Sequence, residues 1–401
     1  MGLGLPQRSG LASNFVLSKD VVFLNHGSFG AAPKTVLDAQ RALRDRLEHN
    51  PMAFFIRDLE GLLDASRTRL AAFVGASPTE LAFVPNATTG VNTVLRSLRF
   101  APGDELVTTN HEYNACKNAL DAVAHESGAK VVVARVPFPL TDPAEVLLAI
   151  LAVVTPRTRL VLVDHVTSPT GLVIPLEAIA QELGRRGIDV LVDGAHAPGM
   201  IPLDLHALGV PFYTANCHKW LCAPKGAAFL YVRDDRQKSV RPLNISHGAN
   251  SPRTDRSRFL VEFDWTGTSD PTPQLCIGDA IDCLDAMVPG GITEIMKRNR
   301  ALALEARTIL AKALGIDPPA PDSMVGSMAA LPLPDGKATV AASLYGDPLQ
   351  EVLQKTWHIE VPIVPWPAPP KRLVRVSAQL YDTRNEYVYL AEKLMTELAR
   401  E

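Results

Sequence analysis

The segment RLVLVDHVTSPTGLVIPLEAIAQELGRRGIDVLVDGAH, residues 159–196, determines the expected fold. It begins and ends with short apolar runs rich in Val and Leu, which are typical of buried strands. Between the two runs, residues 175–187 carry apolar side chains three and four positions apart, as on one face of a helix. A strand, a helix and a second strand in this order indicate two parallel strands joined by a crossover helix.

The same alternation extends over about residues 80–235. Further strand-like runs are LAFVP, ELVTT, KVVVARV and GAAFLYV, and helical stretches such as TGVNTVLRSL separate them. The predicted fold class is therefore α/β, with a mostly parallel sheet sandwiched by helices. Ligands of such sheets bind beyond the carboxyl ends of the strands, so polar residues that directly follow the strand runs are the first candidates for a site.

The pattern divides the chain into three parts. Residues 1–20 predict an N-terminal arm, residues 21–285 a large domain and residues 286–401 a smaller α+β domain. A chain of 401 residues is longer than one small core usually serves, which agrees with this division.

The composition argues against several classes of partner and location. The formal net charge is -3 without a block of like charges, so neither nucleic acid nor an acidic membrane surface is an expected partner. The longest apolar run, residues 146–154, is too short to span a bilayer, and the N-terminus lacks the apolar core of a secretion signal. Five scattered cysteines without a CxxC pair predict reduced thiols. We therefore expect a cytoplasmic protein.

The stretch NCHKWLCAPKG, residues 216–226, places Lys219 in nearly uncharged surroundings. A surface lysine is the simplest interpretation, and Asp193, at the end of a strand-like run, could cap the following helix. One strand–helix–strand excursion separates the two residues, however, and would bring both to the same edge of the sheet. A buried lysine can attack carbonyl groups, and a carboxylate can keep a pyridinium nitrogen protonated. The pair therefore meets the needs of pyridoxal 5′-phosphate (PLP).

The phosphate of PLP needs hydrogen-bond donors. The stretch NATTGVN opens a helix with Thr88, Thr89 and Gly90, and helix N-termini favour anions. Any helix cap has a similar sequence, so this signal is weak by itself. His218, beside Lys219, is a second candidate for the phosphate.

Six segments in this order resemble the class V aminotransferase family of PLP-dependent enzymes, which has the fold-type I architecture. They are LNHGSFGAAP, NATTGVN, HEYNA, HVTSPTG, VDGAHAPG and NCHKWLCAPKG. The resemblance covers nearly the whole chain, is strongest over residues 22–232 and points to the isopenicillin N epimerase-like members of the family.

The resemblance implies a role toward the cofactor for each matching position. Lys219 would bind PLP as an aldimine and transfer protons. Asp193 would pair with the ring nitrogen, and His196 would support Asp193. Tyr113 would stack on the ring, and Ser168 would hydrogen-bond its phenolic oxygen.

Other positions are implied for the substrate and for a second subunit. Arg375, in VRVSAQLYDT, would bind the substrate carboxylate, and His26 and Ser28, in NHGSFG, would lie near the substrate. A surface ion pair is the alternative interpretation of Arg375. Thr268, in WTGTSDP, would reach the phosphate site of a neighbouring subunit, so the resemblance implies a homodimer with shared active sites.

The shared chemistry of the family implies removal of the α-proton from an amino acid or peptide substrate, which gives a quinonoid carbanion. Epimerisation is the first expectation, and Tyr113 and His26 are the candidates to return a proton to the opposite face. A carbon–sulfur β-lyase acting on a cysteine conjugate is the second expectation, and an aminotransferase the third. Cysteine desulfuration is not expected, because it needs a mobile cysteine before the carboxylate-binding arginine and no cysteine follows Cys283.

A metal-dependent hydrolase is the alternative from another class of enzyme. Its ligands would come from a set of acidic and histidine residues, namely Asp164, His165, Asp193, His196 and His218. These residues lack a helical HxxxH pair, and a hydrolase leaves Lys219 unexplained, so no metal site is predicted.

Overall fold

The computed structural model describes residues 4–337 and 346–401. A seven-stranded sheet forms its centre, with the strand order β2-β8-β7-β6-β5-β3-β4. Strand β8 runs antiparallel to both of its neighbours, and the other six strands are parallel to one another. The predicted α/β class is confirmed. The strands are β2 (Leu81–Val84), β3 (Glu105–Thr109), β4 (Lys130–Ala134), β5 (Thr158–Asp164), β6 (Asp189–Asp193), β7 (Phe212–Asn216) and β8 (Ala228–Val232).

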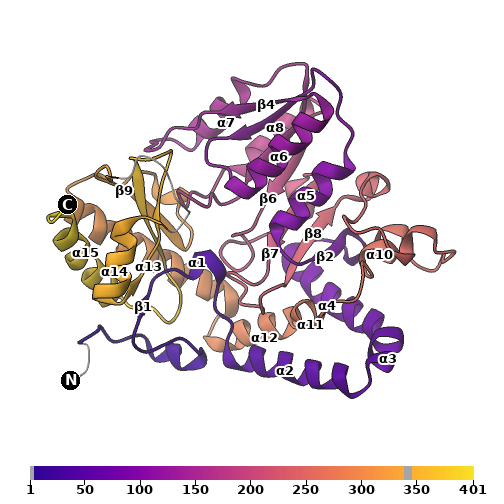
Figure 1. Cartoon of the computed structure of the whole chain (residues 1–401), viewed down its shortest axis with the longest axis horizontal. Helices are drawn as coiled ribbons and strands as arrows, with labels where there is room; N and C mark the ends of the chain where they lie inside the picture. Colours follow the sequence, from indigo (N-terminus) through magenta and orange to yellow (C-terminus); the bar gives the residue numbers. More distant parts are fainter. Residues whose placement is uncertain (1–3, 338–345) are drawn as a thin grey trace.

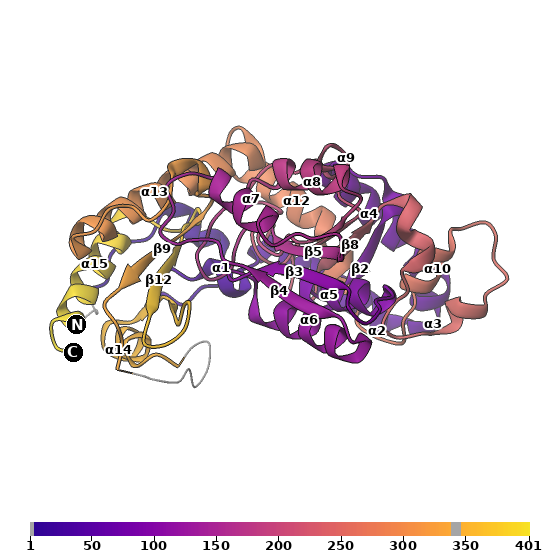
Figure 2. The same cartoon turned by 90° about the horizontal axis from the view of Figure 1, so that it is seen from above.

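Helices cover both faces of this sheet. Helices α5 (Ala87–Ser97) and α6 (Asn114–Ser127) lie on one face, and α7 (Ala144–Leu151) and α8 (Leu176–Arg185) lie on the other (Figure 2). Alternate residues of one strand therefore enter two separate cores. In β5, for example, Leu160 and Leu162 pack with α5 and α6, whereas Val161 and Val163 pack with α7 and α8. Burial on both faces explains why the strands are continuous apolar runs.

Further helices flank the sheet and connect it to the second part of the chain (Figure 1). The connection runs through α12 into α13, the longest of the described helices. The bounds are α2 (Lys34–His49), α4 (Leu59–Val74), α10 (Arg258–Phe263), α12 (Ile277–Met287) and α13 (Gly291–Leu314).

A small antiparallel sheet, in the order β11-β12-β9, forms the second part. It packs with α13 and with the two last helices of the chain. A two-stranded parallel pair, β1 with β10, joins the N-terminal segment to the same region, because Val22 and Leu24 are buried in the small-sheet core. The domain division at residues 285 and 286 stays a prediction, but Val22 and Leu24 pack with the second part. The bounds are β1 (Val22–Phe23), β9 (Met328–Leu333), α14 (Pro348–Trp357), β10 (Ile359–Glu360), β11 (Ile363–Val364), β12 (Arg372–Ser377) and α15 (Arg384–Leu398).

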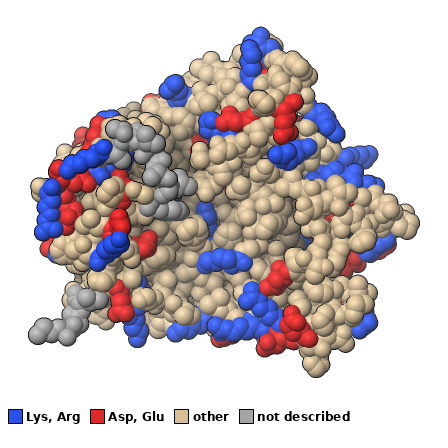
Figure 3. All heavy atoms as spheres, in the orientation of Figure 1, with Lys and Arg blue, Asp and Glu red and all other residues tan. Residues whose placement is uncertain are grey.

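None of the described helices combines the length and the apolar character that crossing a membrane requires. On the face seen in Figure 3, basic and acidic side chains are interspersed around the edges, and a broad area of other residues lies across the middle.

Candidate active site

Lys219 lies in the turn that follows β7, at the carboxyl edge of the large sheet. Two glycines with left-handed backbones, Gly30 and Gly199, approach this turn closely. A Cβ on Gly30 would lie 2.2 Å from the His218 carbonyl oxygen, and one on Gly199 would lie 2.5 Å from the Trp220 backbone. Only glycine fits at such approaches, so the HGSFG and HAPG segments enclose the lysine turn through their glycines.

The Lys219 amine contacts His196, with Nζ 3.2 Å from Nε2 of the imidazole. The Trp220 indole donates to Nδ1 of the same ring at 3.3 Å, so the proton of the neutral ring is on Nε2. An Nε2–H group can donate to Lys219 only when the amine is neutral. Burial lowers the pKa of Lys219 to about 8, although Asp193 acts in the opposite direction. Contacts and burial therefore both favour the nucleophilic form.

The contacts of His196 differ from the sequence interpretation. Both ring nitrogens are engaged, one by Trp220 and one by Lys219, so neither is left to support Asp193. Burial, and next to it the charge of Lys219, lowers the pKa of His196 well below its ordinary value. His196 is thus a neutral group that orients the lysine.

Asp193 ends β6 and is only 2% exposed. Its Oδ1 accepts a hydrogen bond from the Ala195 N–H at 2.9 Å, and its Oδ2 accepts one from the Cys116 thiol at 3.1 Å. Two further buried acids lie nearby. Asp164 is the register partner of Asp193 at the end of β5, and a Glu112 oxygen lies within 4.8 Å of the Cys116 and Asp193 ligand atoms.

Burial raises the pKa of all three acids. Two hydrogen bonds and the attraction of Lys219 favour the charged form of Asp193. Among the described atoms, Glu112 Oε1 and Asp164 Oδ2 have no hydrogen-bond partner. Asp193 is therefore the first of the three to ionise, and its charge keeps the other two protonated.

A cavity of about 610 Å³ opens beside these groups and contains Lys219, Tyr113 and Glu112 in its lining. The volume lies within the range of about 300–1,000 Å³ that is usual for small-molecule and cofactor sites. An amine, an aromatic ring and a buried acid cluster are the groups that PLP would need for its aldehyde, its ring face and its ring nitrogen. The described residues therefore fit this cofactor.

Arg375 enters the same cavity from β12 of the small sheet. Its guanidinium donates to the Ser168 carbonyl at 2.6 Å and to the Ser28 hydroxyl at 3.0 Å. Arg375 is 5% exposed, so it is not a surface ion pair. Three predicted site residues from distant parts of the chain thus meet at one place, where a guanidinium can bind a carboxylate.

His26, predicted to lie near the substrate, is not among the residues that line the large cavity. The ring is 0% exposed and lies behind Lys219. Its Nε2 donates to the Lys219 carbonyl at 3.0 Å, and its Nδ1 accepts from the Tyr381 hydroxyl at 2.7 Å. Burial lowers the pKa of His26 to about 3. Both nitrogens are engaged and the neutral ring supports the lysine turn, so His26 is not available as a base.

The three phosphate candidates at the start of α5, Thr88, Thr89 and Gly90, differ in the hydrogen bonds and the packing contacts that they already make. Asn86 and Asn216 side chains accept from the N–H groups of Thr89 and Ala87, each at 2.8 Å. Among the described residues, no group accepts from the Thr88 N–H or hydroxyl. A Cβ on Gly90 would lie 2.0 Å from the Thr214 hydroxyl, so this glycine is required for packing α5 against β7. Thr88 is the best placed donor of this turn.

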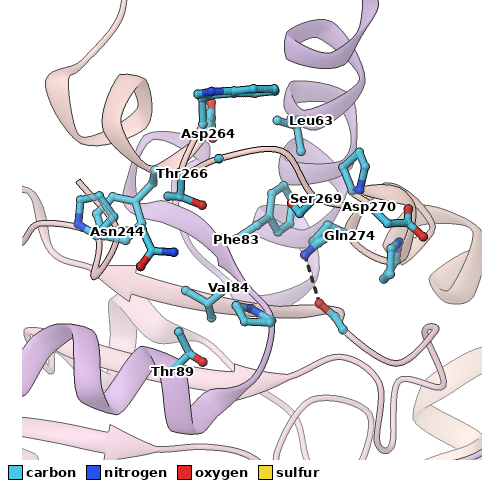
Figure 4. A pocket seen from close by; sticks show the side chains of 18 of the residues that line it. Leu63, Phe83, Val84, Thr89, Asn244, Asp264, Thr266, Ser269, Asp270 and Gln274 are labelled. Atoms are coloured by element: carbon cyan, nitrogen blue, oxygen red, sulfur yellow. Dashed lines mark hydrogen bonds between the residues drawn. The ribbon is translucent and has the colours of Figure 1, made fainter. Parts of the chain in front are cut away.

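His218 and Thr268 lie outside the large cavity. The His218 Nδ1–H donates to the Ala227 carbonyl at 3.0 Å, and burial lowers the pKa of this ring to about 4. Thr268 is exposed in the loop between α10 and α11 (Thr272–Leu275). Neighbours of Thr268 in this loop line a second cavity of about 480 Å³ together with Thr89 (Figure 4).

The ligand set of the hydrolase alternative is not formed. Among the described residues, the acidic, histidine and cysteine side chains close enough to share an ion are Glu112, Cys116 and Asp193. His165 instead bonds the Tyr213 hydroxyl at 2.8 Å, and His218 bonds a carbonyl. Asp193 is therefore the one of the five predicted ligands that belongs to this group of three side chains.

The architecture is the fold-type I arrangement of PLP-dependent enzymes. A cysteine desulfurase from Escherichia coli matches it with a TM-score of 0.77 and 22% identity, covering 96% of this chain and 97% of its own. A C-DES mutant with glycine covalently linked to its PLP cofactor also has a TM-score of 0.77, with 23% identity over 96% and 98% of the two chains.

The Aminotransferase class-V family profile matches residues 23–344, so the chain belongs to this family. Isopenicillin N epimerases of Amycolatopsis lactamdurans and Streptomyces clavuligerus are 38% and 35% identical, each over 94% of this chain and 95% of its own length. A probable chloroplastic L-cysteine desulfhydrase of Arabidopsis thaliana is 31% identical over 94% of this chain and 82% of its own length. The predicted family is confirmed.

Sequence reasoning missed three residues of the site. Cys116 lies in the first turn of α6 and Glu112 lies two residues before the helix begins, and both come next to Asp193. Trp366 lines the large cavity from the proline-rich segment before β12. Its only signal was being the one aromatic residue in VPIVPWPAPP.

Proposed function

We propose that the protein binds PLP and acts at the α-carbon of an amino acid, and that its reaction is epimerisation. The observation that carries the proposal is Lys219, whose amine lines the cavity, contacts His196 and lies in the field of Asp193. A carbon–sulfur β-lyase is the second candidate, since relatives named epimerase and relatives named desulfhydrase both match nearly the whole chain. Transamination is the third.

PLP would supply an aldehyde for a lysine and a protonated ring that withdraws electrons from the α-carbon. Lys219 suits the aldehyde, because a pKa of about 8 leaves more of its amine neutral near pH 7 than in an exposed lysine. The same amine can take the α-proton on one face of the substrate. His196 fixes the direction of the amine through the 3.2 Å contact.

Asp193 would hold the proton of the ring nitrogen. The carboxylate is suited to this task because the Ala195 N–H and the Cys116 thiol already stabilise its charge. Tyr113 would stack on the ring, and Thr88, with Thr89 and His218 nearby, would bind the phosphate.

Arg375 would bind the substrate carboxylate. Its guanidinium is buried and held between Ser28 and Ser168, so a carboxylate would meet a positioned partner. Ser168 would also contact the phenolic oxygen of the cofactor through its hydroxyl.

The choice between epimerisation and elimination depends on a second proton donor. Epimerisation returns a proton to the face opposite Lys219, whereas elimination needs one base and a leaving group. With His26 committed behind the lysine turn, Tyr113 is the remaining candidate, since it lines the same cavity. We therefore assign Tyr113 to the opposite face.

The functional unit would be a homodimer. Leu243 lines the second cavity and is 43% exposed, and the exposed Ile56 and Ile245, at 68% and 61%, directly follow the lining residues Phe55 and Asn244 in the chain. A second copy would cover them, because large apolar groups of this kind mark interaction surfaces. The exposed Thr268 would then reach the phosphate of the neighbouring subunit.

Borohydride reduction tests the cofactor assignment. The purified protein should be yellow, lose this colour on reduction and then carry a covalent pyridoxyl group on the peptide that contains Lys219. Lys219→Ala should show no such label, whereas the control Lys225→Ala, whose amine donates to the Gly30 carbonyl, should keep it. A colourless protein, or a label on another lysine, contradicts the assignment.

Incubation with amino acids in deuterated water tests the reaction. Epimerisation should leave solvent deuterium at the α-carbon and racemise it, whereas elimination should release pyruvate from a cysteine conjugate. In Tyr113→Phe, racemisation should fall about 100-fold while exchange on the lysine face persists. Pyruvate formation that is unaffected by this substitution would favour the lyase.

A further inference from the structure

The outer part of the large cavity is lined on one side by a single apolar segment. Residues 362 and 364–369 contribute four prolines, Val364, Ala368 and Trp366 to the lining, and none of them is charged. Phe29 and Val133 line the same cavity, and Phe29 is 62% exposed. We call residues 364–369 with Phe29 the outer wall.

The outer wall is fixed across the cavity through Trp366. Its ring centroid lies 4.6 Å from that of His111 and 5.5 Å from that of Phe138, and its indole N–H donates to the Asn110 carbonyl at 3.2 Å. These partners follow β3 and β4 of the large sheet, whereas Trp366 lies between β11 and β12 of the small sheet. The indole therefore holds the segment in one position.

The support beneath Trp366 is uncharged. Burial lowers the pKa of His111 to about 4, and its two nitrogens are bonded to the Thr170 hydroxyl at 2.7 Å and the Val136 carbonyl at 3.1 Å. The neutral ring acts as an apolar platform for the indole. The contact between the Trp366 and His111 rings therefore adds no charge to the outer wall.

Among the described residues that line the cavity, the charged ones come from other segments than the outer wall. Lys219 and Glu112 belong to the cofactor end, and Arg375 to the substrate carboxylate. Lys117 at the start of α6 is paired with Asp121 at 2.6 Å. A substrate side chain that leaves the α-carbon toward the outer wall therefore meets aromatic rings and prolines.

We infer that the substrate is an α-amino acid with a bulky, uncharged, apolar side chain, and that Trp366 and Phe29 recognise this group. The inference rests on the proposed function, because it uses Arg375 and Lys219 to place the α-carbon. A small amino acid leaves the wall uncovered, and an acidic side chain loses water there without gaining a partner. The volume of about 610 Å³ has room for such a group beside the cofactor.

Equilibrium binding to the holoenzyme tests the inference. The change in cofactor absorbance gives a Kd for S-methyl-cysteine, S-benzyl-cysteine and glutamate. The native protein should bind the benzyl compound at least about tenfold more tightly than the methyl compound, and glutamate least tightly. Equal constants, or tighter binding of glutamate, would overturn the inference.

Three variants locate the preference. Trp366→Ala and Phe29→Ala should each reduce the benzyl-to-methyl ratio to about threefold or less, while the Kd for S-methyl-cysteine changes less than about twofold. Phe29→Ala leaves the Trp366 anchor intact, so it remains informative if Trp366→Ala disturbs the segment. The control Leu148→Ala, at an exposed apolar residue of α7, should keep the native ratio. A ratio preserved in both wall variants contradicts the assignment of these residues.

The outcomes separate the inference from the function on which it rests. A yellow enzyme that binds all small and bulky amino acids alike rejects the substrate class and leaves PLP chemistry in place. A colourless protein without a label on Lys219 rejects both.

Discussion

The two ends of the large cavity are built in opposite ways. At the inner end, buried polar groups follow strands of the large sheet, and Lys219, Asp193 and His196 each have polar partners. At the outer end, a proline-rich segment of the small sheet presents apolar side chains held by one indole. In the proposed function the large sheet carries the chemistry, and we infer that the proline-rich segment of the small sheet carries the substrate preference.

The largest effect is expected from an acid at the inner end. Asp193→Asn should lower kcat about 1,000-fold with little change in KM, because a neutral amide cannot stabilise a pyridinium ion. Steady-state kinetics measure both constants. The matched control is Asp164→Asn at the neighbouring strand end, where the acid is already protonated, and kcat should stay within about threefold. Equal losses in the two variants would remove the special role of Asp193.

Arg375 lies where the two ends meet, so its loss should affect binding and spare the chemistry. Arg375→Ala should raise KM about 10- to 100-fold, the equivalent of a charged hydrogen-bonded contact, with the cofactor absorbance unchanged. Lys371→Ala, which removes an exposed ion pair with Asp335 just before β12, is the control. An unaltered KM in Arg375→Ala contradicts the carboxylate role.

The lowered pKa of Lys219 predicts how cofactor capture depends on pH. The neutral amine attacks the aldehyde, so the rate at which the apoprotein takes up PLP should rise about tenfold from pH 6 to pH 7 and level off above about pH 9. Stopped-flow absorbance measures this rate. N-acetyl-lysine methylamide serves as the reference and should still gain rate up to about pH 10.5. A protein profile that follows the reference shows that burial does not activate the lysine.

The last prediction concerns Glu112 and appears in stability, not in catalysis. Burial raises the pKa of this acid in the folded protein, so the folded state binds more protons than the unfolded state above about pH 5. Stability should therefore fall as the pH rises, by up to about 1.4 kcal/mol per pH unit for one such group. Glu112→Gln should flatten this fall, which urea unfolding between pH 5 and pH 8 measures. An identical pH slope in both proteins would show that Glu112 is ionised when folded.

The inner end was largely predictable from the sequence, because its residues directly follow strands that short sequence patterns reveal. Apolar runs mark the strands, and Lys219 and Asp193 follow two of them directly, so their meeting at one edge follows from the parallel sheet. Resemblance to the family added Arg375, which the structure places in contact with Ser28 and Ser168.

The remaining features depend on contacts between distant segments. His26 lies beside Ser28 in sequence, yet it turns behind Lys219 because Tyr381 and a carbonyl engage its ring. Gly90 resembles a phosphate-binding glycine, yet its place is set by the Thr214 side chain. Trp366 is held by the rings of His111 and Phe138, which lie more than 200 residues away in the chain. No local sequence pattern predicts such a contact.

The parallel pairing of β1 with β10 bears on motion during the reaction cycle. Val22 and Leu24 pack in the small-sheet core, whereas His26 and Gly30 contact the Lys219 turn, so the segment that carries Ser28 joins the two parts of the chain. A rotation of the small sheet would move Arg375 away from Ser168 and break its hydrogen bond to the Ser168 carbonyl. A carboxylate that accepts hydrogen bonds from Arg375 and from the Ser168 hydroxyl would draw the two residues together, so ligand capture and domain closure would be a single event.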